Sequence, residues 1–121
     1  MPRTQTALLS IAFALFAGNA WSACARNEYG VFEDIGCASE ALAKAEAELN
    51  TIYKKLLKSG DRPQQKALAK AQRNWLAFLS AQAEFVYAAE GDGSSGRLVL
   101  VNEREELMRA RAKALRSWVP R

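Results

Sequence analysis

Apolar residues recur at alternating steps of three and four along most of the chain after residue 39, and this spacing constrains the fold most strongly. It places the apolar side chains on one face of an α-helix. No stretch alternates apolar and polar residues for more than a few positions, as a half-buried strand does. Leu98–Val101 could form a short strand, but these residues lead directly into a helical pattern. The spacing therefore predicts an all-α fold.

Turn-forming residues divide this pattern into three predicted helices. The first begins after Ser39, a good N-cap, and stops at Gly60. The second begins at Asp61 with a capping-box pattern and runs to a flexible loop at 91–96, and the third runs from about 97 to 118. Because the connections are short, we expect an antiparallel bundle of three main helices, with a disulfide-bridged N-terminal segment packed across it.

The same periodicity predicts which side chains face the core. In the first helix they are Leu42, Ala45, Leu49, Ile52 and Leu56. In the second they are Leu68, Ala71, Trp75, Phe78, Gln82, Phe85 and Ala89, with Leu79 and Val86 beside them. In the third they are Leu100/Val101, Arg104, Leu107/Met108, Arg111, Ala114/Leu115 and Trp118. The two arginines are expected to meet carboxylates or carbonyls and to tie helix ends together; a ligand-facing Arg111 is the alternative.

Residues 1–23 have the pattern of a secretory signal peptide. Arg3 precedes an apolar run at 7–17 that is too short to cross a bilayer, and small residues follow it. Cleavage is expected between residues 20 and 23, which leaves residues 24–121 as a single exported domain, periplasmic or secreted. Two alternatives remain open: an uncleaved membrane anchor, and a lipoprotein site ending at Cys24.

Cys24 and Cys37 are the two cysteines of the chain. In an oxidising compartment an even pair is typical of a disulfide. A metal site is disfavoured because the chain has no histidine and no third cysteine, and a redox site because there is no Cys-x-x-Cys. The sequence thus predicts a structural disulfide, no metal and no cofactor.

The expected mature chain carries a net charge of only +3. This is compatible with a slight preference for anionic envelope polymers, but it is not the dense basic stripe of a nucleic-acid-binding protein. Without histidine, the chain has no Ser-His or Cys-His nucleophile pair. Glu103, Glu105 and Glu106 are expected near the start of the third helix, where acids favour the helix dipole. These observations predict a protein that is not an enzyme.

An ordered set of motifs carries a resemblance to a known family. The set is Cys24, Cys37, Leu49-Asn50-x-x-Tyr53, Gln72-x-x-Trp75, Gly93-Ser94 and Leu107-x-x-x-Arg111. It resembles the LprI-type lysozyme-inhibitor domain of small secreted or periplasmic bacterial proteins, over about residues 24–115. Family members usually carry a second cysteine pair, for which this chain has Ala83 and Glu103, and many have Arg-Asp where it has Leu79-Ser80.

The resemblance implies a protein that binds a lysozyme or another envelope protein. We expect the motif residues Leu49, Asn50, Tyr53, Gln72, Trp75 and Arg111 to form the seam between helices, although they could instead line a binding site. A protein that inserts into a glycosidase cleft needs hydrogen-bond donors and a cation to face the two carboxylates of the cleft. Ser94, Ser95 and Arg97 supply both from the glycine-rich loop. For lysozyme inhibition, Lys54, Lys55 and Lys58 at the end of the first helix are the second candidate surface. The alternative function is a general envelope module that binds another protein or an anionic polymer.

Overall fold

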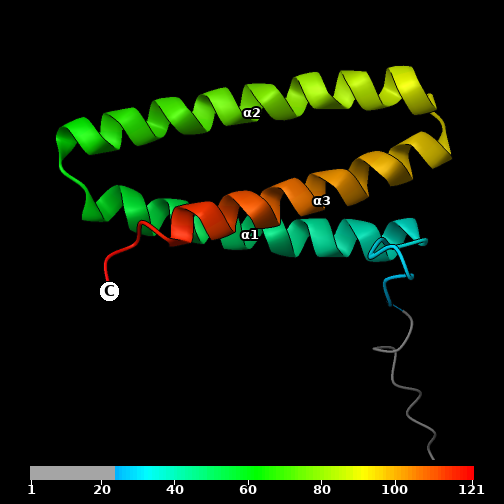
Figure 1. Ribbon diagram of the computed structural model, residues 1–121, viewed down its shortest axis with the longest axis horizontal. Helices are drawn as coiled ribbons and strands as arrows, with labels where there is room; N and C mark the ends of the chain where they lie inside the picture. The colour runs from blue at the N-terminus through cyan, green and yellow to red at the C-terminus, as the bar shows by residue number, and fades with distance from the viewer. Residues whose placement is uncertain (1–23) are drawn as a thin grey trace, which may run out of the picture.

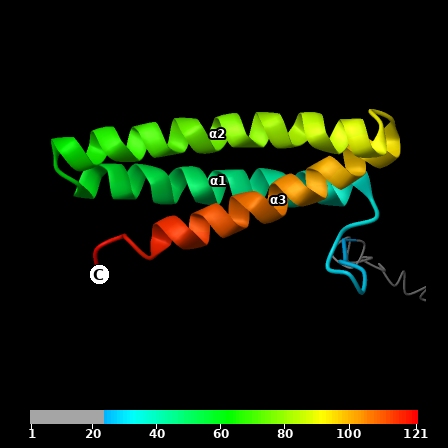
Figure 2. The same ribbon diagram turned by 45° about the horizontal axis from the view of Figure 1, so that its top comes forward.

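The structure, a computed structural model, describes residues 24–121 and contains three helices: α1 (Ile35–Ser59), α2 (Arg62–Glu90) and α3 (Ser94–Arg116). The predicted signal peptide lies outside these residues. α1 and α3 lie along each other and run in the same direction, and α2 packs antiparallel to both (Figure 1; Figure 2). A disulfide joins Cys24 to Cys37. The predicted all-α bundle with a bridged N-terminal segment is confirmed.

Local capping chemistry sets the helix ends. The Asp61 side chain accepts a hydrogen bond from the Gln64 backbone N–H, and the Gln64 side chain accepts one from the Asp61 backbone N–H, which completes the predicted capping box. α1 also ends at Gly60 as predicted. The predicted Ser39 cap is wrong, because Asp34 caps α1 by accepting from the Cys37 N–H. α1 therefore already includes the bridged cysteine.

The main core lies where the three helices meet. Its buried members are Ala45, Leu49, Ile52, Leu79, Met108, Ala112 and Leu115, and the half-buried Leu42, Tyr53, Leu56, Leu68, Trp75, Leu107 and Val119 pack against it. A smaller cluster of Phe32, Cys37 and Ala38 joins the N-terminal segment to the start of α1 and to α3. All five predicted core positions of α1 belong to the main core or pack against it.

The predicted core face of α2 is partly wrong. Ala71, Phe78, Phe85 and Ala89 are exposed, with Phe85 at 63% of its full accessibility. The face that packs on the bundle instead consists of Gln72, Leu79 and Val86, which are buried, and Leu68, Trp75 and Gln82, which are half-buried. Two series of residues, offset by one position, both follow steps of three and four along this helix, and the prediction mixed them.

The third helix also differs from its predicted pattern. α3 ends at Arg116, so Trp118 lies beyond the helix and is 76% exposed, and Ala114 is exposed as well. The buried face includes two polar residues, Asn102 and Glu105. Residues 98–101 are helical, which excludes the short strand considered above.

The connection between α2 and α3 is a tight corner. Gly91 has a φ of +81°, in the left-handed region that favours glycine. A Cβ on Gly96 would lie 1.8 Å from the Gly91 carbonyl oxygen, so only glycine permits this approach of the two backbones. α3 begins at Ser94, and the predicted loop at 91–96 is therefore shortened to residues 91–93.

Candidate partner-binding site

The predicted contact residues lie on the first turn of α3, not in a flexible loop. Ser94, Ser95 and Arg97 are all exposed, at the end of the bundle where α2 turns into α3 (Figure 1). The N-cap of α3 is Gly93, and no side chain caps the helix. The first backbone N–H groups of a helix lack partners within it and favour negative charge. We call Gly91–Arg97 the corner; it presents two hydroxyls, a guanidinium, the Asp92 carboxylate and a helix N-terminus.

Five of the six family-motif residues meet in the seam between the helices. Leu49 is buried, and Tyr53 and Trp75 pack against the main core. Arg111 Nε donates to Gln72 Oε1 over 3.2 Å, and its guanidinium carbon lies 5.9 Å from the centre of the Trp75 ring. Arg111 thus joins α3 to α2 and contacts both parts of the Gln72-x-x-Trp75 motif.

The sixth motif residue, Asn50, is exposed on α1. It lies at the edge of a shallow pocket of about 260 Å³, which Tyr53, Gln72 and Trp75 also line. The arrangement is that of a helix seam with a small depression at its surface. Arg104 behaves differently from Arg111: it is half-buried, and within the part of the chain that the structure describes its Nε has no hydrogen-bond partner.

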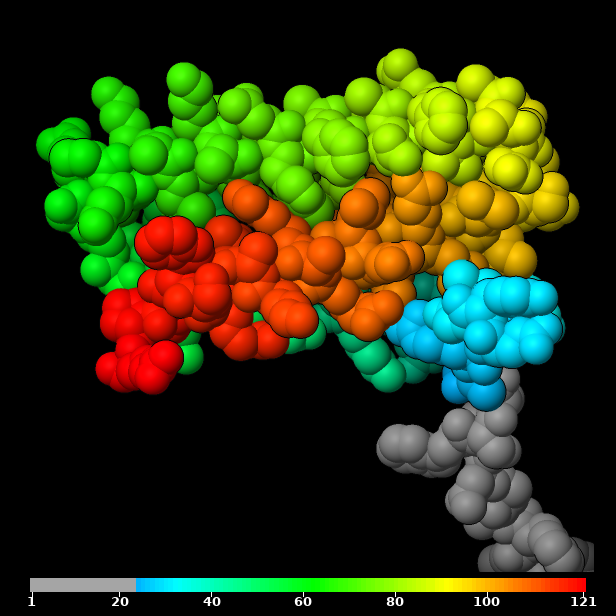
Figure 3. All heavy atoms as spheres, viewed as in Figure 1, coloured from blue at the N-terminus to red at the C-terminus, as the bar shows by residue number. Residues whose placement is uncertain are grey.

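The N-terminal segment is fastened to the helices at three points. The disulfide holds it to α1. The Asn102 side chain of α3 accepts from the Phe32 backbone N–H and donates to the Phe32 carbonyl, both over 2.8 Å. Arg26 reaches α3 through Glu105 Oε1 at 2.7 Å and also lies over the Phe32 ring, with its guanidinium carbon 4.4 Å from the ring centre. In the space-filling view this segment is a compact unit against α3 (Figure 3).

Glu105 is the most buried charged residue among those described, with 2% exposure. Burial raises the pKa of its carboxyl group, but hydrogen bonds and charge from Arg26 and Arg109 outweigh this effect and leave the pKa below its ordinary value. Arg109 Nε lies 2.6 Å from Glu105 Oε1. Glu105 is therefore a charged anchor for the N-terminal segment, not a solvated acid at a helix start as predicted.

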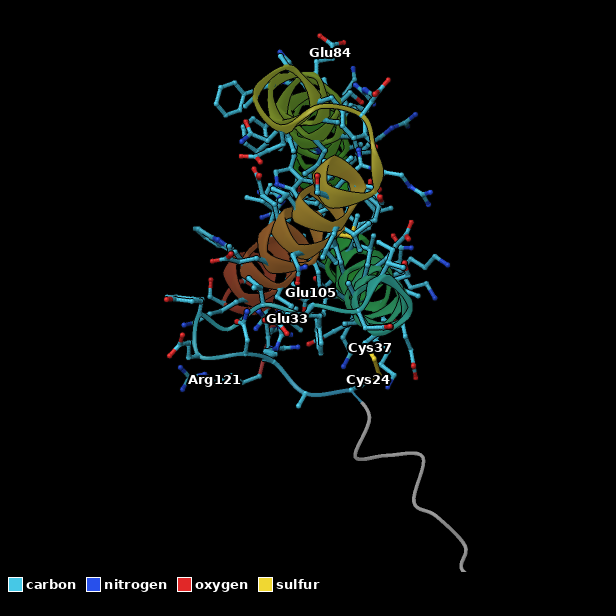
Figure 4. The ribbon with its side chains drawn as sticks, turned by 90° about the vertical axis from the view of Figure 1, so that its right-hand side faces the viewer. Cys24, Glu33, Cys37, Glu84, Glu105 and Arg121 are labelled. Atoms are coloured by element: carbon cyan, nitrogen blue, oxygen red, sulfur yellow. A yellow bond between two sulfur atoms is a disulfide. The ribbon has the colours of Figure 1, made fainter. Side chains whose placement is uncertain are left out.

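A groove of about 680 Å³ lies beside this anchor, between the N-terminal segment, α1 and α3. Figure 4 shows Glu105 above Cys24 and Cys37 at this end of the molecule. The groove is lined by cations and anions in equal number: Arg26, Lys44 and Arg109 with Glu40, Glu48 and Glu105. The groove therefore has no excess of charge that would favour an anionic or a cationic ligand. Within residues 24–121, no group of three His, Cys, Asp or Glu side chains could hold a metal ion.

The sequence patterns did not identify Arg26, Asn102 or Arg109, and they assigned Glu105 to the helix start and not to an anchor. Asn102 and Glu105 lie at helical spacing on the same face as Met108, Ala112 and Leu115. This spacing is the one sequence feature that indicates their burial. A polar residue on a buried stripe needs a partner. Arg109, four residues after Glu105, supplies one within the helix, whereas Arg26 is distant in sequence and could not be identified from spacing.

The structure also locates the lysine cluster, the predicted ion pair of the first helix and the positions where relatives carry a second cysteine pair. Lys54, Lys55 and Lys58 are exposed near the end of α1. Glu40 and Lys44 form the predicted pair on α1, at 3.4 Å. Gln82 Nε2 donates to Glu103 Oε1 over 2.5 Å, so α2 and α3 meet beside Ala83 and Glu103, where relatives are expected to carry cysteines.

The disulfide also bears on the lipoprotein alternative. Lipid attachment would use the Sγ atom of Cys24, which here is bonded to Cys37. The helices of the described region are all too short or too polar to cross a membrane.

Comparison with known proteins identifies the family. The family model described as lysozyme inhibitor LprI matches residues 22–115, which is most of the chain. No curated protein and no solved structure matches it. With its bridged N-terminal segment, its seam of motif residues and this match, the chain belongs to the LprI lysozyme-inhibitor family.

Proposed function

We propose that this chain is an exported, non-enzymatic binding protein that blocks a lysozyme-type glycosidase by inserting its α2–α3 corner into the substrate cleft. Such a cleft carries two carboxyl groups that flank the scissile bond. The corner offers donors from the Ser94 and Ser95 hydroxyls and one cation, Arg97, beside the uncapped N-terminus of α3; its one carboxylate is Asp92. Charge-assisted hydrogen bonds to carboxylates are stronger and shorter than neutral ones.

The observation that carries this proposal is the close backbone packing at the corner. The close approach of Gly96 to the Gly91 carbonyl fixes the two helices at this end, so the donors stand on a defined backbone. A preorganised contact loses less conformational entropy on binding than a flexible loop does. The family match supports a lysozyme as the partner.

A lysozyme-activity assay with the purified domain, residues 24–121, tests the proposal. The wild-type domain should slow the enzyme at micromolar concentration. Replacing Ser94, Ser95 and Arg97 with Ala should abolish inhibition and leave the circular dichroism spectrum unchanged, because all three side chains are exposed. The matched control replaces Lys54, Lys55 and Lys58 with Ala; they are exposed near the end of α1, at the opposite end of the bundle, and at high salt this variant should inhibit like wild type.

A general envelope module is the second candidate. The net charge of +3 expected for residues 24–121 and the exposed lysines at the end of α1 favour an anionic envelope polymer as its ligand. If the wild-type domain does not slow lysozyme, this function replaces the first. If the lysine variant loses inhibition and the corner variant keeps it, the contact surface is the lysine cluster.

A further inference from the structure

Helix α2 carries a second apolar stripe that the bundle leaves in solvent. Its members follow steps of four and three without interruption, and each one is exposed. They are Ala67, Ala71, Asn74, Phe78, Ala81, Phe85 and Ala88. A repeat of this kind, with an average spacing of 3.5 residues, is the seam of a coiled coil. We call these seven residues the outer stripe.

The outer stripe lies beside the face of α2 that packs on α3 and α1, one residue out of step with it. Its two large members, Phe78 and Phe85, are 46% and 63% exposed. Only Asn74 is polar. An exposed apolar strip along about six turns is unusual for a monomer and is typical of a contact surface. The bundle buries its own seam through Gln72, Leu79 and Val86, and within residues 24–121 nothing covers the outer stripe.

We propose that the outer stripe pairs with the outer stripe of a second copy of this chain, with the two α2 helices antiparallel and the two-fold axis near Ala77 and Phe78. This register places every large side chain opposite a small one or near the axis. Phe85 lies opposite Ala71 of the second copy, and Asn74 lies opposite its Ala81. Large and small residues in alternation are what an interdigitated helix seam requires.

Charge selects the antiparallel direction. Lys70 and Glu84 flank the outer stripe on the side away from the bundle, each seven residues from Ala77. Figure 4 shows Glu84 directed away from the other two helices. In the antiparallel register each Lys70 faces Glu84 of the second copy, so two opposite-charge pairs form. In a parallel pair Lys70 and Glu84 would instead face Trp75 and Ala89 of the second copy, so neither opposite-charge pair would form.

The other charged residues of α2 are also divided between a basic first half and an acidic second half. The first half of the helix carries Arg62, Lys66, Lys70 and Arg73, and the second half carries Glu84 and Glu90. Antiparallel pairing brings each basic half against an acidic half. The shared seam is roughly 32 Å long at the rise of an α-helix. The two corners then lie at opposite ends of the dimer, and each stays free for a partner.

Sedimentation velocity on residues 24–121, over a concentration range up to millimolar, tests the dimer. The wild type should change from monomer to dimer as concentration rises. The double variant Phe78→Gln/Phe85→Gln should raise the dimer dissociation constant about tenfold or more, which corresponds to at least one lost hot-spot contact. Gln keeps the helix propensity and adds no charge.

Leu76→Gln is the matched control, because Leu76 is also half-exposed on α2, at 49%, but lies off the outer stripe. It should leave the dissociation constant unchanged. Circular dichroism should show all variants folded, since the replaced side chains are exposed. A wild type that stays monomeric at millimolar concentration overturns the proposal, and so does a dimer that tolerates the Phe pair of substitutions.

Charge reversal tests the antiparallel register separately. Lys70→Glu alone creates two like-charge contacts and should weaken the dimer about tenfold. Glu84→Lys alone should have the same effect. The double variant Lys70→Glu/Glu84→Lys restores opposite charges across the axis and should return the dissociation constant to the wild-type value. A double variant that is weaker than either single variant overturns the antiparallel register.

Discussion

At the scale of single residues, side chains from distant parts of the chain fix one another. Arg26 and Glu105 are 79 positions apart, yet they form the charged link between the N-terminal segment and α3. Gln72 and Arg111, 39 positions apart, join α2 to α3 beside Trp75. Such links place polar groups in the seam without leaving them unpaired, which would be costly.

The lowered pKa of Glu105 predicts a pH-dependent stability. A carboxyl group whose pKa is depressed in the folded state stabilises the fold at pH values above its unfolded pKa. That stabilisation is lost as pH falls through the folded pKa. Glu105→Gln should therefore cost about 1–3 kcal/mol of unfolding free energy at neutral pH and much less at pH values below the folded pKa. Urea unfolding at both pH values measures this difference.

Glu106→Gln is the control for Glu105, because Glu106 is the next residue of α3 and is exposed. Its unfolding free energy should follow the wild type at both pH values. A Glu105→Gln variant whose loss of stability is the same in acid as at neutral pH would show that shape, not charge, is what Glu105 contributes.

Trp75 should contribute to stability through packing. It is half-buried against the main core and lies beneath the Arg111 guanidinium, so Trp75→Ala should lower the unfolding free energy by roughly 2–3 kcal/mol, somewhat less than for a fully buried Trp. Leu76→Ala, at the neighbouring half-exposed position, should cost less than about 1 kcal/mol. Thermal unfolding of Trp75→Ala at the wild-type temperature would contradict a packing role.

At the scale of helices, the α2–α3 corner is the element whose geometry depends most on one residue type. Gly96→Ala places a Cβ against the Gly91 carbonyl, and α2 and α3 must separate to admit it. We expect a loss of roughly 2–4 kcal/mol, as for other overpacked or strained sites. Gly93→Ala is the matched control, since its Cβ would meet nothing within 4 Å. Chemical denaturation of both variants gives the comparison, and equal stabilities would refute the tight corner.

At the scale of the whole molecule, features set by local chemistry were predictable and features set by distant partners were not. The Asp61 capping box, the Gly60 stop and the cysteine pair each depend on a few residues near in sequence, and each is confirmed. The core face of α2 was predicted incorrectly, because two stripes one residue apart satisfy the same period and only packing chooses between them. Glu105 was missed as an anchor because its partner Arg26 lies at the other end of the chain.

The charge of the whole domain makes a prediction about its association with a basic lysozyme. Residues 24–121 carry a net charge of +3, so long-range repulsion should slow the encounter even though the corner offers local complementarity to a cleft of carboxylates. Salt screens interactions beyond about 10 Å at moderate ionic strength, whereas contacts inside the cleft are screened less. The association rate constant should therefore rise as salt is added, and the dissociation rate constant should rise little.

Surface-immobilised lysozyme and a salt series measure both constants. Replacing Lys54, Lys55 and Lys58 with Ala removes three positive charges far from the corner, so this variant should associate faster than wild type at low salt and at the same rate at high salt. An association rate that falls with salt in the wild type would contradict the predicted long-range repulsion. If the lysine variant then also associates more slowly than wild type, the contact lies at the end of α1 and not at the corner.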